Sequence, residues 1–217
     1  MFTVVPEYAG TNESLDAIVL GLDVGLGDTV LAVAGSGDQA FAMLAAGARV
    51  TAVDSRSAQI KYVLHRVNCL RKGDVPGFLG QSLGTSTGTI SGPYFQAHGR
   101  IELVRQNLAN LEVLPNIDIA DAARGEVFTK IYTSNIYDYT ERYSMRRSLE
   151  ILAASLAPGG LLYTAIEAMA SRQLGEDYMA SMGLQFDAPS TAIARQHEEL
   201  MWNPVVYRKM PSPAVSP

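Results

Sequence analysis

The sequence is poor in the features that mark several classes of protein. Its 217 residues include a single cysteine, Cys69, which excludes an internal disulfide and favours a reducing compartment, so we expect a cytoplasmic protein. No apolar run is as long as a membrane-spanning helix, and the first residues lack the basic and apolar segments of a signal peptide. Basic residues are scarce, because 17 Lys and Arg stand against 22 Asp and Glu. The net charge of −5 argues against nucleic acid or an anionic membrane as a partner, and favours a small molecule.

The length suits one hydrophobic core. We expect a single domain over residues 1–210 and a disordered, proline-containing tail over 211–217. A segment rich in glycine, serine and threonine, at 74–99, interrupts the regular pattern. A loop of this length inside a compact domain is typical of a functional lid or of a disordered insertion, and both interpretations stay open.

Alternating short strands and helices predict an α/β fold. The apolar run at 29–34 is bounded by glycine and predicts a buried strand, followed by a helix over 38–46 and a second strand over 49–53. This order predicts a doubly wound, mostly parallel sheet with helices on both faces. Further strands are expected at 116–120, 128–133, 161–166 and 205–208, and further helices at 57–72, 101–111, 145–156 and 171–182.

A glycine turn and an acid follow the first two strands. Gly35 and Gly37 come after the first strand, and Asp54 ends the second. Such a turn lets a ligand approach the backbone, and a carboxylate at the second strand end can accept both ribose hydroxyls, so the spacing indicates a nucleotide site. The alternative is that the glycines only turn the chain and that Asp54 caps the next helix.

Asp38 bears on which nucleotide binds. Residues 35–40 fit the dinucleotide pattern G-x-G-x-x-A, but Asp38 would place a negative charge beside the amides that receive a pyrophosphate. S-adenosylmethionine has adenosine, no phosphate and a sulfonium, and its ammonium would suit Asp38. The sequence therefore predicts S-adenosylmethionine as ligand. No metal is expected, since His197-Glu198-Glu199 lacks the second histidine of a metalloprotease motif.

Four segments resemble the class I S-adenosylmethionine-dependent methyltransferases: VLAVAGSGDQA, VTAVD, the strand entering SNIYDY, and APGGLLY. The likeness covers residues 25–166 and implies the seven-stranded, Rossmann-type sheet of that family. The chain departs from the family at Val33, which stands where the first glycine of the motif is usual, and at Leu31 and Ala32, where an acid is often found. The resemblance places Asp121 at the adenine amino group, with Asp118 as the competing choice.

Within that superfamily the chain resembles the enzymes that transfer the 3-amino-3-carboxypropyl group of S-adenosylmethionine. Asn12-Glu13, the GSGDQA turn, residues 54–59 and Ser134-Asn135-Ile136 carry this likeness. Relatives include the diacylglycerol transferase of betaine-lipid synthesis and the small azetidine-2-carboxylate synthases. A short chain leaves little room for a large acceptor, which favours cyclisation to azetidine-2-carboxylate with release of methylthioadenosine. Transfer of a methyl or aminocarboxypropyl group to a small acceptor, and a binder without activity, are the alternatives.

Five polar or aromatic residues complete the candidate site. Ser134 and Asn135 follow the fourth expected strand, where the Asn135 amide oxygen could accept from the substrate amine or only bond its own turn. Tyr137 and Tyr139 could present rings to the sulfonium or pack in the core. Tyr8 is expected to fold over the ligand. The arginines are interpreted as solvent-facing at positions 56, 66, 71, 142, 146 and 147.

Overall fold

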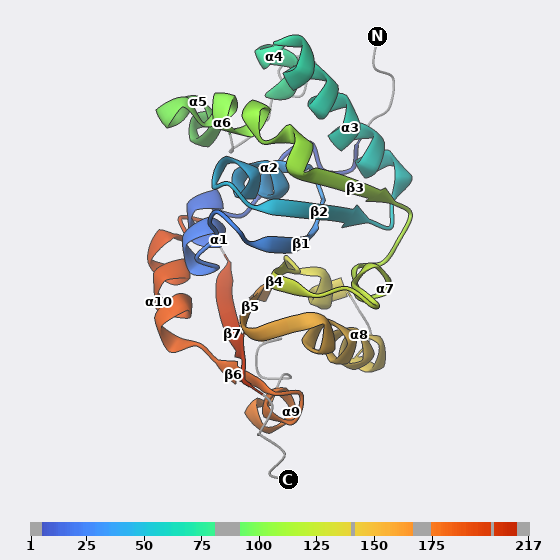
Figure 1. Cartoon of the computed structure of the whole chain (residues 1–217), viewed down its shortest axis with the longest axis vertical. Helices are drawn as coiled ribbons and strands as arrows, with labels where there is room; N and C mark the ends of the chain where they lie inside the picture. Colours follow the sequence, from blue (N-terminus) through green and yellow to red (C-terminus); the bar gives the residue numbers. More distant parts are fainter. Residues whose placement is uncertain (1–5, 81–91, 140–141, 167–174, 201, 212–217) are drawn as a thin grey trace.

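A computed structural model describes residues 6–80, 92–139, 142–166, 175–200 and 202–211, with side chains described except at 138–139, 142–143 and 166 (Figure 1). Its centre is a seven-stranded sheet in the order β3-β2-β1-β4-β5-β7-β6. The strands are β1 (Thr29–Val33), β2 (Arg49–Asp54), β3 (Leu111–Pro115), β4 (Phe128–Tyr132), β5 (Leu156–Ile166), β6 (Leu184–Phe186) and β7 (Asn203–Lys209).

The pairing of the strands is mostly parallel. The neighbours from β3 to β5 all pair in parallel, whereas β7 runs antiparallel to both β5 and β6. The expected doubly wound, mostly parallel sheet of seven strands is therefore confirmed. The strand order reverses between β1 and β4, and a crevice forms at such a switch point, outside the carboxyl ends of the strands.

Helices cover both faces of the sheet because alternate strand residues point to opposite sides. Val30 and Ala32 of β1 belong to one apolar cluster, which includes residues of α1, α2, α3, α6 and α10, whereas Leu31 belongs to another with α7, α8 and α9. The helices are α1 (Leu15–Gly21), α2 (Asp38–Ala45), α3 (Ser57–Lys72), α4 (Val75–Phe78), α5 (Gly92–Gln96), α6 (Arg100–Gln106), α7 (Ile119–Ala123), α8 (Arg142–Ser155), α9 (Glu176–Ser181) and α10 (Ala188–His197).

Several sequence expectations differ from the structure. The strand expected at 116–120 is wrong: β3 is Leu111–Pro115, paired in parallel with β2. Asp118 instead caps α7, since its side chain accepts from the Ala120 amide at 2.8 Å. The elements β6 and α10 were not expected. Residues 81–91 of the expected lid and 212–217 of the expected tail lie outside the described residues.

Within the ranges that the structure describes, every helix is too short or too polar to cross a lipid bilayer.

Candidate active site

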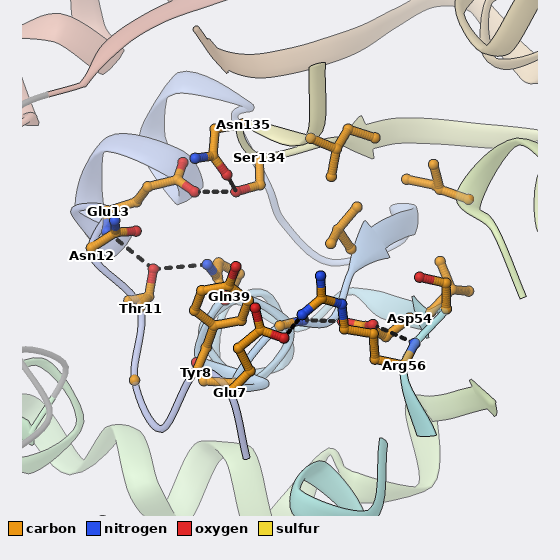
Figure 2. Close-up of a pocket in the computed structure, with 18 of the residues that line it drawn as sticks. Glu7, Tyr8, Thr11, Asn12, Glu13, Gln39, Asp54, Arg56, Ser134 and Asn135 are labelled. Atoms are coloured by element: carbon orange, nitrogen blue, oxygen red, sulfur yellow. Dashed lines mark hydrogen bonds and ion pairs between the residues drawn. The ribbon is translucent and has the colours of Figure 1, made fainter. Parts of the chain in front are cut away.

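A cavity of about 470 Å³ opens where β1, β2 and β4 end (Figure 2). The turn after β1, the acid at the end of β2 and the turn after β4 line it, and the segment before α1 forms a further wall. This is the position at which ligands bind in doubly wound folds. The predicted site residues that line the cavity are Tyr8, Gly35, Asp54, Ser134 and Asn135.

The two glycines of the first turn serve different purposes. Both have positive φ angles, 48° at Gly35 and 91° at Gly37, which favour glycine. Gly35 lines the cavity, and its amide donates to Asp54 Oδ2 at 3.2 Å. Gly37 is not among the lining residues: a Cβ there would lie 2.9 Å from the Phe41 ring. Gly37 thus packs closely against Phe41, and its expected ligand contact stays a prediction.

Asp38 does not line the cavity, contrary to the sequence expectation. Its carboxylate is fully buried and lies 2.7 Å from the guanidinium of Arg66, which is fully buried too. It also accepts hydrogen bonds from the Thr11 amide at 2.8 Å and the Ser36 hydroxyl at 2.9 Å. The Arg66 guanidinium lies 4.7 Å from the centre of the Phe78 ring. The Asp38 carboxylate thus bonds to groups inside the protein, and Arg66 is a buried arginine, not a solvent-facing one.

Asp54 presents a fixed carboxylate to the cavity. Its Oδ2 accepts from the Gly35 amide and its Oδ1 from the Arg56 amide, at 3.2 and 2.8 Å. Burial raises the pKa of Asp54 above its ordinary value, and the two backbone hydrogen bonds partly offset this rise. A carboxylate oriented in this way can accept hydrogen bonds from vicinal hydroxyls.

Residues 7–12 form the wall of the cavity that precedes α1, and a buried glutamine holds them. Gln59 of α3 accepts from the amides of Glu7 and Tyr8 at 2.6 and 3.1 Å. Its Nε2 donates to the Tyr8 and Gly35 carbonyls at 3.0 and 2.8 Å, so one side chain joins this wall to the glycine turn. Tyr8 lines the cavity and is 49% exposed, which puts its ring at the edge.

Glu13 is an acidic residue of the cavity for which no role was predicted from the sequence. It is 2% exposed, and its Oε1 accepts from the Tyr132 hydroxyl at 2.6 Å and from the Ser134 hydroxyl at 2.5 Å. Ser134 has a φ of 55°, an uncommon value for a residue with a side chain, in the turn that carries Asn135. The Asn12-Glu13 pair before the first helix is the sequence signal that could have identified it.

Two other predicted residues, Asp121 and Tyr137, do not line the cavity. Asp121 pairs with Arg124 at 3.1 Å on the surface of α7, whereas Asp118 lines the cavity. Tyr137 is 5% exposed and packs in the core, where burial raises the pKa of its hydroxyl well above the ordinary value. The side chain of Tyr139 lies outside the described residues. The candidate for the adenine contact therefore becomes Asp118.

The lining of the cavity has more acidic than basic side chains. It includes four carboxylates, and its guanidinium, on Arg56, pairs with one of them, Glu7. The other three carboxylates belong to Glu13, Asp54 and Asp118, so the cavity favours a positively charged ligand. Among the residues that the structure describes, no group of three or more His, Cys, Asp and Glu is placed to hold a metal ion.

The sequence matches no protein-family model and no curated protein. Solved structures match it in fold. A TehB-like S-adenosylmethionine-dependent methyltransferase from Corynebacterium glutamicum has a TM-score of 0.56 at 12% identity, over 93% of this chain and 90% of that one. The (4+2)-cyclase SpnF has a TM-score of 0.57 at 13% identity, over 91% of this chain and 80% of that one. The N-methyltransferase NodS from Bradyrhizobium japonicum, bound to S-adenosylhomocysteine, has a TM-score of 0.51 at 15% identity. The match covers 89% of this chain and 83% of that one. The chain therefore has the fold of the S-adenosylmethionine-dependent methyltransferases.

Proposed function

We propose that the protein is an S-adenosylmethionine-dependent enzyme that cyclises its substrate to azetidine-2-carboxylate and releases methylthioadenosine. The observation that carries this proposal is a cavity of single-ligand size whose lining is acidic at both ends. Its 470 Å³ falls within the range of sites for one small molecule. A reaction of one substrate with itself needs no second site.

The lining residues fit the parts of S-adenosylmethionine in order. Asp54 would accept the ribose hydroxyls, as the acid at the end of the second strand does in nucleotide-binding folds. Asp118 would accept from the adenine amino group. Ser134 and Asn135 lie on the far side of the cavity from Asp54, where the methionine moiety would extend (Figure 2). The acidic lining favours the sulfonium and the ammonium of this ligand.

The chemistry requires one carbon to be placed in line with one nucleophile. The amine loses a proton, its nitrogen forms a bond to the γ-carbon, and the bond from that carbon to sulfur breaks with both electrons going to sulfur. Methylthioadenosine leaves as a neutral thioether. Positioning supplies most of the rate, because the reaction joins two atoms of the same molecule. Asn135 is assigned the role of aiming the amine through its amide oxygen.

Purified protein incubated with S-adenosylmethionine alone tests the proposal. We expect methylthioadenosine and a four-carbon imino acid in equal amounts. Homoserine lactone has the same mass and arises when the carboxylate attacks the same carbon, so the products are treated with alkali before mass spectrometry. The lactone then becomes homoserine, whereas azetidine-2-carboxylate is unchanged.

The outcomes separate the alternatives. No methylthioadenosine above the protein-free control refutes cyclisation. Turnover that begins only when small amines or thiols are added identifies a transferase, with methylthioadenosine marking aminocarboxypropyl transfer and S-adenosylhomocysteine marking methyl transfer. Asn135→Ala should keep S-adenosylhomocysteine binding and lose most of the turnover. An unchanged rate would remove Asn135 from the mechanism.

A further inference from the structure

Glu13 and Gln39 line the side of the cavity away from Asp54 (Figure 2), and both hydrogen-bond one buried hydroxyl. Glu13 precedes α1, Gln39 lies in α2, and the hydroxyl belongs to Tyr132 at the end of β4. Glu13 and Gln39 both line the cavity and are 2% and 6% exposed. Three segments distant in sequence thus place two polar side chains at one point.

The hydrogen-bond directions around Tyr132 are fixed. Its hydroxyl donates its one proton to Glu13 Oε1 at 2.6 Å, so it can only accept from Gln39 Nε2, at 3.1 Å. The same Nε2 donates its second hydrogen to the Thr11 hydroxyl oxygen at 2.8 Å. Both N–H groups of the Gln39 amide are therefore used, which fixes the orientation of the amide.

Gln39 Oε1 is left as a buried acceptor without a hydrogen-bond partner in the described structure. Such an atom is costly to bury unless a donor hydrogen-bonds to it, and a ligand in the cavity can supply that donor. A carboxylate and an amide oxygen on one wall of a cavity form an acceptor site that carries a negative charge. A primary ammonium, with three N–H donors and a positive charge, matches this site.

We propose that Glu13 and Gln39 are the amine-activating pair of the enzyme. Gln39 Oε1 holds one N–H of the substrate ammonium, and the Glu13 carboxylate takes the proton that must leave before the nitrogen attacks. The nitrogen lone pair then forms the bond to the γ-carbon, and sulfur keeps the electrons of the bond that breaks. Glu13 afterwards releases its proton to water. This inference rests on the proposed function and names the residues that take the role expected of Asp38.

Several titratable groups lie near Glu13. Tyr132 and Tyr163 face it from β4 and β5, and burial together with Glu13 itself raises the pKa of each hydroxyl well above the ordinary value. Asp38, which accepts from the Thr11 amide, is neutralised by its ion pair. Glu198 accepts a hydrogen bond from the hydroxyl of Ser14, the N-cap residue of α1 directly after Glu13, at 3.1 Å.

A binding experiment tests the amine site without turnover. S-adenosylhomocysteine is compared with its analogue that lacks only the amino group, by calorimetry, on wild type, Gln39→Leu and Glu13→Gln. We expect both variants to bind S-adenosylhomocysteine at least tenfold more weakly and the deaminated analogue with nearly wild-type affinity, because a hydrogen bond to a charged group is lost. Asp118→Asn is the matched control, and it should weaken both ligands equally. Thermal unfolding checks that each variant is folded.

The pH dependence of methylthioadenosine release tests the proton step. Glu13→Gln keeps the shape and should lower the rate at pH 7 by about 100-fold, the usual contribution of a positioned base. Its residual rate should rise with pH toward that of wild type, because the amine then loses its proton without help. Asp118→Asn should leave the shape of the profile unchanged.

The results distinguish the two proposals. Equal weakening of both ligands by Gln39→Leu, or an unchanged rate and profile in Glu13→Gln, overturns the amine-activating pair and leaves the proposed function standing. A wild type that binds S-adenosylhomocysteine but releases no methylthioadenosine overturns the proposed function and the proton step with it.

Discussion

The ion pair of Asp38 and Arg66 lies where an unpaired charge would be most costly. Both side chains are fully buried, and the guanidinium lies 5.0 and 4.7 Å from the ring centres of Phe41 and Phe78. Removing one partner of a buried pair leaves the other charge uncompensated, at a cost of about 3–5 kcal/mol. Arg66→Met keeps an apolar side chain of similar length between the rings, so the losses are the charge and the hydrogen bonds that Arg66 donates to the carbonyls of Phe78 and Ser36.

We expect Arg66→Met to lower the free energy of unfolding by about 3–5 kcal/mol. A chain of this size loses roughly 2–4 °C in melting temperature for each kcal/mol, so the fall should be on the order of 6–20 °C. Urea denaturation, followed by the fluorescence of the single tryptophan Trp202, gives the free energy directly. The double variant with Asp38→Asn should be more stable than Arg66→Met alone, because it leaves no charge behind.

The same variants separate a structural Asp38 from a ligand-binding one. If Asp38 contacted the ligand, Asp38→Asn would weaken S-adenosylhomocysteine binding and leave the stability near that of wild type. The structure predicts the reverse: a large loss of stability and little change in affinity. A loss below about 1 kcal/mol in Arg66→Met would refute the burial argument. Additive losses in the double variant would refute the pairing.

Three further changes test other parts of the structure. Asp54→Asn should lower S-adenosylhomocysteine affinity at least tenfold. In wild type the affinity should fall on acidification from above the ordinary carboxyl range, because burial raises the pKa of Asp54, and the variant should lack this fall. Calorimetry between pH 4 and 8 measures both effects. Asp187 caps α10, and although burial alone would raise its pKa, hydrogen bonds and an ion pair lower it. Its contribution is therefore present above pH ~4 and lost as the pH falls through the folded-state pKa, so Asp187→Ala should cost about 1 kcal/mol in urea at pH 7 and less in acid. Gly37→Ala should lower the free energy of unfolding more than Gly159→Ala does. Both glycines have positive φ, but only a Cβ at position 37 would lie within 3 Å of a ring, that of Phe41. Equal losses in urea denaturation would contradict the packing role of Gly37.

Local patterns were enough to predict the central strands. The run that forms β1 is largely apolar, and the one that forms β4 is rich in aromatic and β-branched residues. Turn residues follow both runs, so their signal does not depend on the rest of the chain. β3 was missed because Leu108 and Leu111 continue the spacing of the preceding helix. Its strand character comes from pairing with β2, which no local pattern records. β6 was missed because it has only three residues, too few for a local pattern, and all three pair with β7.

The candidate site was also predicted only in part, for the same reason. Asp54 and Asn135 were predicted because Asp54 ends one strand that a local pattern identifies and Asn135 lies in the turn after another. Glu13 was not given a role, because its neighbours Tyr132 and Ser134 come from β4 and the turn after it, more than a hundred residues along the chain. Contacts across this separation are set by the topology of the sheet, which a single sequence does not specify residue by residue.

An acid directly after a glycine turn can face a ligand or the protein interior, and spacing alone does not distinguish the two. What decides here is Arg66, which α3 buries beside Asp38. The internal pair neutralises Asp38, so this acid no longer supplies the negative charge that the ligand was expected to meet. Glu13 supplies that charge instead, at the cavity surface and beside the Ser134 hydroxyl. The argument for a cationic ligand therefore no longer needs Asp38, and it now rests on Glu13 together with Asp54 and Asp118.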